Sequence, residues 1–256
     1  MKQGDFSLLA DNYAKYRPGY SNLVLNNLTS YLKLNLNSAR VADVGAGTGI
    51  WTKQLNDFGL KKIFAIEPNE EMRKQGIKYC NETNIKWSNG SAEKTNLNTS
   101  SIDWLTMASS FHWADLESAL NEFHRVIKPG GYFTILWNPR NIATSPIHLE
   151  IEKLINDFIP NLKRVSSGLD KHVIDYHIEL GSTGQFGNIL FVEHCYSISI
   201  SKDRYIGAWR SVNDIQAQAG PKKFEEIIRA IEKKLISLNE IVVPYKTRSW
   251  TAERLD

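Results

Sequence analysis

Three glycines at alternate positions constrain the fold of this chain more than any other feature. The stretch Val41–Val44 is apolar apart from Asp43, and Gly45, Gly47 and Gly49 follow it before a helical pattern begins. Glycine is required where the backbone takes a positive φ or where a ligand must touch the main chain. The pattern therefore predicts a buried strand, a tight loop, and a helix whose free N–H groups face a bound molecule.

The dinucleotide fingerprint of nicotinamide-dependent oxidoreductases fits this loop poorly. Its third glycine would stand at position 50, which is Ile50. Asp43 would also bring a negative charge close to a pyrophosphate, whereas it would suit a cationic ligand head. An oxidoreductase is therefore an alternative that the residues disfavour.

The loop resembles the cofactor loop of class I S-adenosylmethionine-dependent methyltransferases, whose pattern is acidic-x-Gly-x-Gly-x-Gly. In that family the loop wraps the methionine end of the cofactor. Three further elements of the family follow in order within residues 39–138. Ile63–Asn69 resembles the second strand with its ribose-binding acid, Gly90–Glu93 resembles the adenine-side loop, and Lys128–Gly131 resembles the turn before the fifth strand.

This resemblance implies S-adenosylmethionine as the cofactor. Within the core it implies cofactor-binding roles for Asp43, Gly45, Ala46, Gly47, Glu67, Pro68, Met72, Ala92, Glu93 and Ser109. Glu67 is expected to bind the ribose hydroxyls, and Ala92 and Glu93 to read the adenine edge. Met72 is expected against the adenine, although an ordinary core methionine on a helix is an equally good interpretation.

The segment before the first strand, residues 1–33, is expected to form two short helices. Its stretch Tyr13–Tyr20 resembles the N-terminal segment of the trans-aconitate-methyltransferase-like small-molecule group, which carries a type 11 methyltransferase domain. There, aromatic and arginine side chains close over the cofactor. The resemblance makes Tyr13, Tyr16 and Arg17 candidates for such a lid, with Arg17 as a partner for the methionine carboxylate. Alternatively, the tyrosines only pack the helix onto the sheet.

From residue 39 the sequence alternates strands and helices, as expected for a parallel sheet. We expect an α/β fold with a Rossmann-like, seven-stranded, mostly parallel sheet, helices on both faces and an antiparallel last strand. A single methyltransferase domain over residues 1–256 would contain the cofactor core at 39–138 and closing strands at 189–200 and 240–250. Pro244 predicts that the last strand lies at an edge. The helical stretches 139–187 and 202–238 are candidates for a substrate cap.

The methyl acceptor should lie near the carboxyl ends of the fourth and fifth strands. The candidate pocket residues are Tyr13, Phe111, His112, Trp113, Trp137, Arg140 and Trp209. His112 is the candidate general base, because its unperturbed pKa lies near neutrality. The preferred interpretation is an oriented pocket wall, since transfer to a carboxylate or a neutral amine needs no base.

The composition of the chain argues against some classes of binding partner. A net charge of +3 over 256 residues is too small and too dispersed to favour nucleic acid. There is no leader-like segment or apolar window of membrane-spanning length, and the two cysteines lack paired or metal spacing. We expect a cytoplasmic enzyme, monomeric or homodimeric and without a metal, that methylates an oxygen or nitrogen of a small molecule. A non-catalytic binder of S-adenosylmethionine is the other alternative.

Overall fold

The computed structural model describes residues 10–81, 83–163 and 176–256, apart from the side chains of Ala10, Asp11 and Tyr13. Parts of two predicted segments therefore lie outside the described residues. These are residues 1–9 of the predicted N-terminal lid and residues 164–175 of the predicted cap. The predicted role of the Tyr13 side chain also lies outside them.

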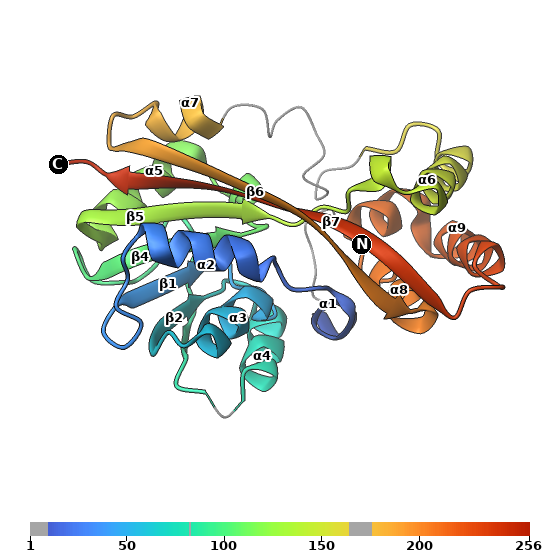
Figure 1. Ribbon diagram of the computed structural model, residues 1–256, viewed down its shortest axis with the longest axis horizontal. Helices are drawn as coiled ribbons and strands as arrows, with labels where there is room; N and C mark the ends of the chain where they lie inside the picture. The colour runs from blue at the N-terminus through green and yellow to red at the C-terminus, as the bar shows by residue number, and fades with distance from the viewer. Residues whose placement is uncertain (1–9, 82, 164–175) are drawn as a thin grey trace. The chain divides into compact units, whose positions relative to one another are not determined.

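In the described part of the chain, seven strands form one sheet in the order β3-β2-β1-β4-β5-β7-β6 (Figure 1). The strands are β1 (Arg40–Val44), β2 (Lys62–Ile66), β3 (Lys86–Ser88), β4 (Ile102–Ala108), β5 (Ile127–Trp137), β6 (Phe186–Ser201) and β7 (Glu240–Arg254). The pairs from β3 to β5 are parallel, and β7 runs antiparallel to β5. The predicted mostly parallel, Rossmann-like sheet with an antiparallel last strand is confirmed.

Nine α-helices are described, and most of them lie between consecutive strands in the sequence. They are α1 (Ala10–Tyr16), α2 (Asn22–Tyr31), α3 (Ile50–Phe58), α4 (Glu70–Tyr79), α5 (Leu116–Val126), α6 (Pro146–Phe158), α7 (Tyr176–Gly181), α8 (Lys202–Trp209) and α9 (Asn213–Lys234). Two short 3₁₀ helices, η1 (Phe111–Trp113) and η2 (Ile142–Thr144), follow β4 and β5. Gly220 interrupts α9 with a φ of 72°, just before Pro221.

The chain divides into two compact units. The sheet unit comprises Gly19–Asn138, Lys171–His194 and Thr247–Asp256, and the helical unit comprises Met1–Pro18, Pro139–Asp170 and Cys195–Lys246. Strands β6 and β7 contribute residues to both units. The single methyltransferase domain and the substrate cap at 139–187 and 202–238 stay predictions.

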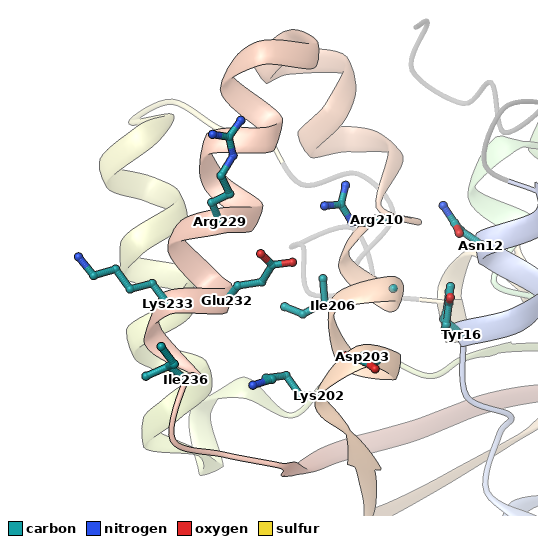
Figure 2. A pocket seen from close by; sticks show the side chains of 11 residues that line it. Asn12, Tyr16, Lys202, Asp203, Ile206, Arg210, Arg229, Glu232, Lys233 and Ile236 are labelled. Carbon is teal, nitrogen blue, oxygen red and sulfur yellow. The ribbon is translucent and has the colours of Figure 1, made fainter.

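The helical unit has a hydrophobic core of its own. Amphipathic spacing on α6 and α9 buries Ile151 and Ile155 together with Ile227, Ile228 and Ile231. A cavity of about 630 Å³ lies within this unit, lined by side chains of α1, α8 and the C-terminal half of α9 (Figure 2). The helical unit therefore has its own hydrophobic core, which packs α6 against α9, and a cavity next to α8 and α9.

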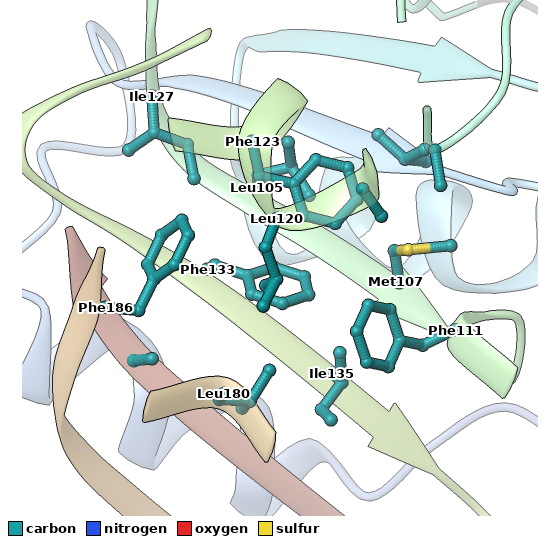
Figure 3. Packing of buried hydrophobic residues seen from close by; sticks show 14 of the residues in the cluster. Leu105, Met107, Phe111, Leu120, Phe123, Ile127, Phe133, Ile135, Leu180 and Phe186 are labelled. Atoms are coloured by element: carbon teal, nitrogen blue, oxygen red, sulfur yellow. The ribbon is translucent and has the colours of Figure 1, made fainter. Parts of the chain in front are cut away.

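The sheet unit has one apolar cluster on each face of its sheet. Residues of α5 and α7 share a cluster with Ala42 and Val44, whereas residues of α2 and α3 share the other with Val41. This division follows the alternation of side chains along β1. Phe133 joins the first cluster, with its ring centroid 4.7 Å from that of Phe123 on α5 (Figure 3). Helices on both faces of the sheet were predicted.

The prediction that the last strand lies at an edge was wrong. β7 lies between β5 and β6 in the sheet order. It pairs with β5 only from Arg248 to Glu253, so Pro244 stands beyond the paired stretch and its missing N–H costs no bond to β5. Its carbonyl oxygen accepts a bond from Asn141 N at 2.8 Å.

Close packing of α4 against β3 makes Gly76 sensitive to substitution. A Cβ atom at Gly76 would lie 2.2 Å from Cη2 of Trp87, so the indole would have to move. We expect Gly76→Ala to lower the free energy of unfolding by about 1–3 kcal/mol despite the better helix propensity of alanine. Urea unfolding checks this, and Trp87→Phe added to Gly76→Ala should restore part of the loss. A Gly76→Ala variant as stable as the wild type would contradict the packing.

Candidate cofactor and active site

The three glycines of the loop between β1 and α3 differ in how closely neighbouring side chains pack against them. Gly45, Gly47 and Gly49 have φ values of 68°, 56° and 82°. A Cβ atom at Gly45 would lie 2.6 Å from Ser110 Oγ, and one at Gly49 would lie 2.9 Å from Cys80 Sγ. At Gly47 the nearest atom is Met72 Cε, at 3.4 Å. The loop therefore needs glycine for packing at positions 45 and 49, whereas a side chain at position 47 would make only an ordinary contact with Met72.

Glu67, directly after β2, connects this loop to α4. Its Oε2 accepts a bond from Gly47 N and its Oε1 accepts one from Asn69 N, both at 2.8 Å. The side chain is buried, which raises its pKa, while these two bonds and the charge of Arg73 oppose the rise. Each carboxylate oxygen keeps a second lone pair for a further donor. Asn69 also caps α4 by accepting from Met72 N.

Asp43, the acid before the glycine loop, is predicted to face a bound cationic group. Its carboxylate is completely buried, where Thr52 Oγ1 donates to Oδ2 at 2.5 Å and Thr106 Oγ1 donates to Oδ1 at 3.3 Å. Burial raises its pKa to about 7. Hydroxyl side chains of α3 and β4 therefore bond the Asp43 carboxylate, and its contact with a cofactor stays a prediction.

The predicted adenine-side loop follows β3. Ala92 is buried in the same apolar cluster as Ala42, while Pro68, which follows Glu67, is exposed. Glu93 Oε1 accepts a bond from Asp115 N at 3.0 Å, which ties the loop to the N-cap of α5. A contact of Ala92 or Glu93 with a base stays a prediction.

Ser109, directly after β4, has a φ of 56°, unusual for a residue with a side chain. Its Oγ lies 2.8 Å from the hydroxyl of Tyr20. Gln54 on α3 holds the Tyr20 backbone by accepting from its N–H and donating to its carbonyl oxygen. Tyr20 was not among the predicted site residues, and its contact with Ser109 makes it a further candidate. The available signal was its place as the last tyrosine of the aromatic and arginine-containing segment.

His112 lies on η1, with its ring centroid 4.7 Å from that of Trp113. Trp137 Nε1 donates to its Nδ1 at 3.4 Å. An indole N–H can only donate, so Nδ1 accepts and the neutral ring carries its proton on Nε2. This Nε2 is buried without a hydrogen-bond partner among the described residues, and burial lowers the pKa of His112 to about 4. Of its two predicted roles, the structure favours the oriented, uncharged pocket wall.

Part of the sequence is similar to known methyltransferases. Residues 42–135 match the family model described as a methyltransferase domain. An uncharacterized methyltransferase of Mycobacterium tuberculosis is 33% identical over 129 residues, 50% of each chain. A methyltransferase-like protein of Schizosaccharomyces pombe is 29% identical over 147 residues, 57% of this chain and 56% of the other.

Solved structures show the same fold over most of the chain. A putative type II methyltransferase from Anaeromyxobacter dehalogenans has a TM-score of 0.60 at 17% identity, covering 94% of this chain and 99% of that one. A Haemonchus contortus phosphoethanolamine N-methyltransferase, solved with S-adenosyl-L-methionine, has a TM-score of 0.54 at 14% identity, covering 98% and 57%.

Residues 42–135 carry a methyltransferase domain, and the sheet has the fold of class I S-adenosylmethionine-dependent methyltransferases. The chain spans about half the length of the curated relatives that it matches. The domain match argues against the nicotinamide alternative and makes S-adenosylmethionine the cofactor of this domain. The likeness to the trans-aconitate-like group stays a prediction.

The described residues among the predicted pocket candidates do not share one environment. Phe111 is buried in the core against Phe133, at 5.5 Å between centroids, so it packs the sheet (Figure 3). Trp137 is also buried and stacks on Tyr176 at 4.9 Å, but its indole N–H reaches His112. Trp113 is 45% exposed. Among the described pocket candidates of the sheet unit, His112, Trp113 and Trp137 therefore form a local cluster near the end of β4.

The predicted lid residues lie in the helical unit. Arg17 Nε donates to Ser211 Oγ at 2.9 Å, and Arg17 Nη2 donates to the Ser211 carbonyl oxygen at 3.4 Å. Tyr16 packs on Gly207 of α8, where a Cβ atom would lie 2.5 Å from its ring, and it faces the cavity of this unit (Figure 2). Contact of Tyr16 or Arg17 with the cofactor stays a prediction.

No helix among the described residues is long and apolar enough to cross a membrane. Nor does any group of three or more His, Cys, Asp or Glu side chains in the described ranges have the arrangement of a metal site.

Proposed function

We propose that this chain transfers the methyl group of S-adenosylmethionine to an oxygen or nitrogen of a small-molecule acceptor. The observation that carries the proposal is the glycine loop at positive φ, whose Gly47 N–H is bonded to the buried carboxylate of Glu67. The Glu67 carboxylate, with spare lone pairs, and the Met72 side chain both lie beside Gly47. These residues fit the cofactor that the family uses.

The cofactor supplies a methyl group that is already activated by the positive charge of its sulfonium. The protein is then expected to bind and orient rather than to generate a nucleophile. Glu67 would hold the ribose hydroxyls, the main chain at Gly47 would approach the methionine end, and Met72 would contact the adenine. The mild net charge of +3 supports a small molecule over a nucleic acid as the acceptor.

Product analysis tests the proposed activity. The purified protein, with S-adenosylmethionine and a panel of carboxylic acids, phenols and amines, should release S-adenosylhomocysteine together with a methylated acceptor detected by mass spectrometry. The Glu67→Ala variant is the control for background release. Cofactor binding without turnover of any acceptor class would favour the non-catalytic binder instead.

His112 should act in this reaction through its orientation rather than as a base. Because burial lowers its pKa to about 4, the ring stays neutral from pH 5 upward, and the rate should show no acidic limb near pH 6–7 caused by this histidine. His112→Gln should mainly raise KM. A pH–rate profile and separate kcat and KM values check this. A kcat loss above about 100-fold at unchanged cofactor affinity would instead identify a general base.

A further inference from the structure

The two edge strands of the described sheet differ in how well they are protected from pairing with another chain. β3 and β6 stand at the two ends of the strand order (Figure 1). β3 has three residues and carries the exposed Lys86, and short, charged edges of this kind resist pairing. β6 has sixteen residues, and its stretch 186–192 contains neither a charged residue nor a proline. The β6 edge therefore lacks these protections.

The run Ile189–Val192 on β6 has the sequence of a buried strand but is not buried. Four consecutive apolar residues are typical of a strand that is covered throughout. Leu190 and Val192 pack only partly against the apolar cluster of α2 and α3, and Ile189 packs partly against the cluster on the other face. Phe191 is 40% exposed, although its ring centroid lies 4.8 Å from that of Trp250. The run therefore has apolar surface left to cover.

β6 uses only one of its two sides for pairing within the described residues. Ser249 Oγ donates to the Val192 carbonyl oxygen at 3.3 Å, and Asn188 Nδ2 donates to Glu253 Oε2 at 2.9 Å, so β6 runs antiparallel to β7. In the strand order of the described chain, no strand lies on the other side of β6. Backbone N–H and C=O groups that point to that side can pair with an added strand.

An added strand would also contact apolar side chains next to this edge. The ring of His177 on α7 has its centroid 6.3 Å from that of Phe191, which places the start of α7 beside the exposed part of β6. The next residue, Ile178, is 66% exposed. Phe191 and Ile178 would therefore add apolar contacts to the backbone pairing.

The charges of this edge suit a second copy of the same segment. Arg248 Nε lies 2.7 Å from the Glu193 carboxylate, so the first charge beyond the apolar run is already balanced within the chain. In a two-fold contact the segment faces itself in the opposite direction. Antiparallel pairing centred between Leu190 and Phe191 opposes apolar residues and keeps the two Glu193 side chains about 17 Å apart. Parallel pairing would place the two like charges side by side, which is destabilising.

We propose that the β6 edge at Ile189–His194 pairs antiparallel with the same segment of a second copy, so that the two sheets join into one. The backbone of β6 supplies the ladder, and Phe191 with Ile178 supplies the apolar contacts beside it. The interface lies within the sheet unit, and it is independent of the proposed methyl transfer.

Hydrogen exchange at several protein concentrations tests this pairing in the full chain. Sedimentation velocity should show a monomer at low concentration and a particle of two chains at high concentration. The amides of residues 189–194 should then exchange about tenfold more slowly in the dimer than in the diluted monomer. Those of β3, the opposite edge, should exchange equally in both. A monomer at every concentration, or a dimer in which residues 189–194 exchange as in the monomer, would overturn the proposal.

Phe191→Lys should leave the protein monomeric at the concentrations where the wild type is a dimer, because it places a charge on the edge. Ile77→Lys is the matched control, since Ile77 is a 50% exposed apolar residue on α4, and it should dimerise normally. Ile178→Lys should weaken dimerisation at unchanged Tm, which separates the interface from the packing of Phe191 on Trp250. Dimerisation of both Phe191→Lys and Ile178→Lys at wild-type strength would contradict the pairing.

Discussion

Gly47→Val is expected to abolish cofactor binding while leaving the fold intact. Valine at this position would fill the space beside the loop, since Met72 Cε already lies 3.4 Å from the position of a Cβ atom. The φ of 56° is also unfavourable for a β-branched residue. Circular dichroism measures whether the variant is folded, and a calorimetric titration with S-adenosylhomocysteine measures whether it binds the cofactor product.

Gly130→Val provides the matched control for this variant. Gly130 has a φ of 69°, but a Cβ atom there would meet nothing within 4 Å. Its replacement introduces a comparable backbone strain, of the order of 1–2 kcal/mol, far from the loop in the sequence. Gly130→Val should therefore bind the cofactor normally. If Gly47→Val bound it equally well, the loop would be only a structural turn.

Glu67→Ala should weaken cofactor binding by about 1.5–3 kcal/mol, the usual range for hydrogen bonds to a charged group. The variant leaves the ribose hydroxyls without their acceptor. It also releases Gly47 N and Asn69 N, which Glu67 holds at 2.8 Å, so the loop loses its link to α4.

Binding isotherms for Glu67→Ala and for Glu71→Ala measure this loss. Glu71 lies on the exposed face of α4, where it pairs with Lys74, and its replacement should have no effect on affinity. Unchanged affinity in a correctly folded Glu67→Ala variant would remove Glu67 from the site.

Local patterns in the sequence were sufficient to predict the sheet and the loop. Alternating strands and helices predicted the parallel core, and three glycines followed by a helix predicted the turn between β1 and α3. Periodicity and turn residues act over a few positions, so elements of this kind can be recognised without tertiary information. Glu67 at the end of β2 was predicted from the resemblance of Ile63–Asn69 to the second strand of the family.

Features that depend on distant residues could not be predicted. The burial of Asp43 depends on Thr52 and Thr106, which the fold brings to it from α3 and β4. The interior place of β7 depends on where its pairing with β5 ends, not on Pro244 itself. Tyr20 became a candidate only when its hydroxyl was found beside Ser109.

The central claim is that the glycine loop and Glu67 bind S-adenosylmethionine, and isothermal titration calorimetry tests it most directly. Titrations with S-adenosylmethionine, S-adenosylhomocysteine and NADH under the same conditions compare the two cofactor classes that such loops serve. The account predicts binding of S-adenosylmethionine and S-adenosylhomocysteine in the micromolar range, with no heat of binding for NADH. Binding of NADH without binding of S-adenosylmethionine would contradict it.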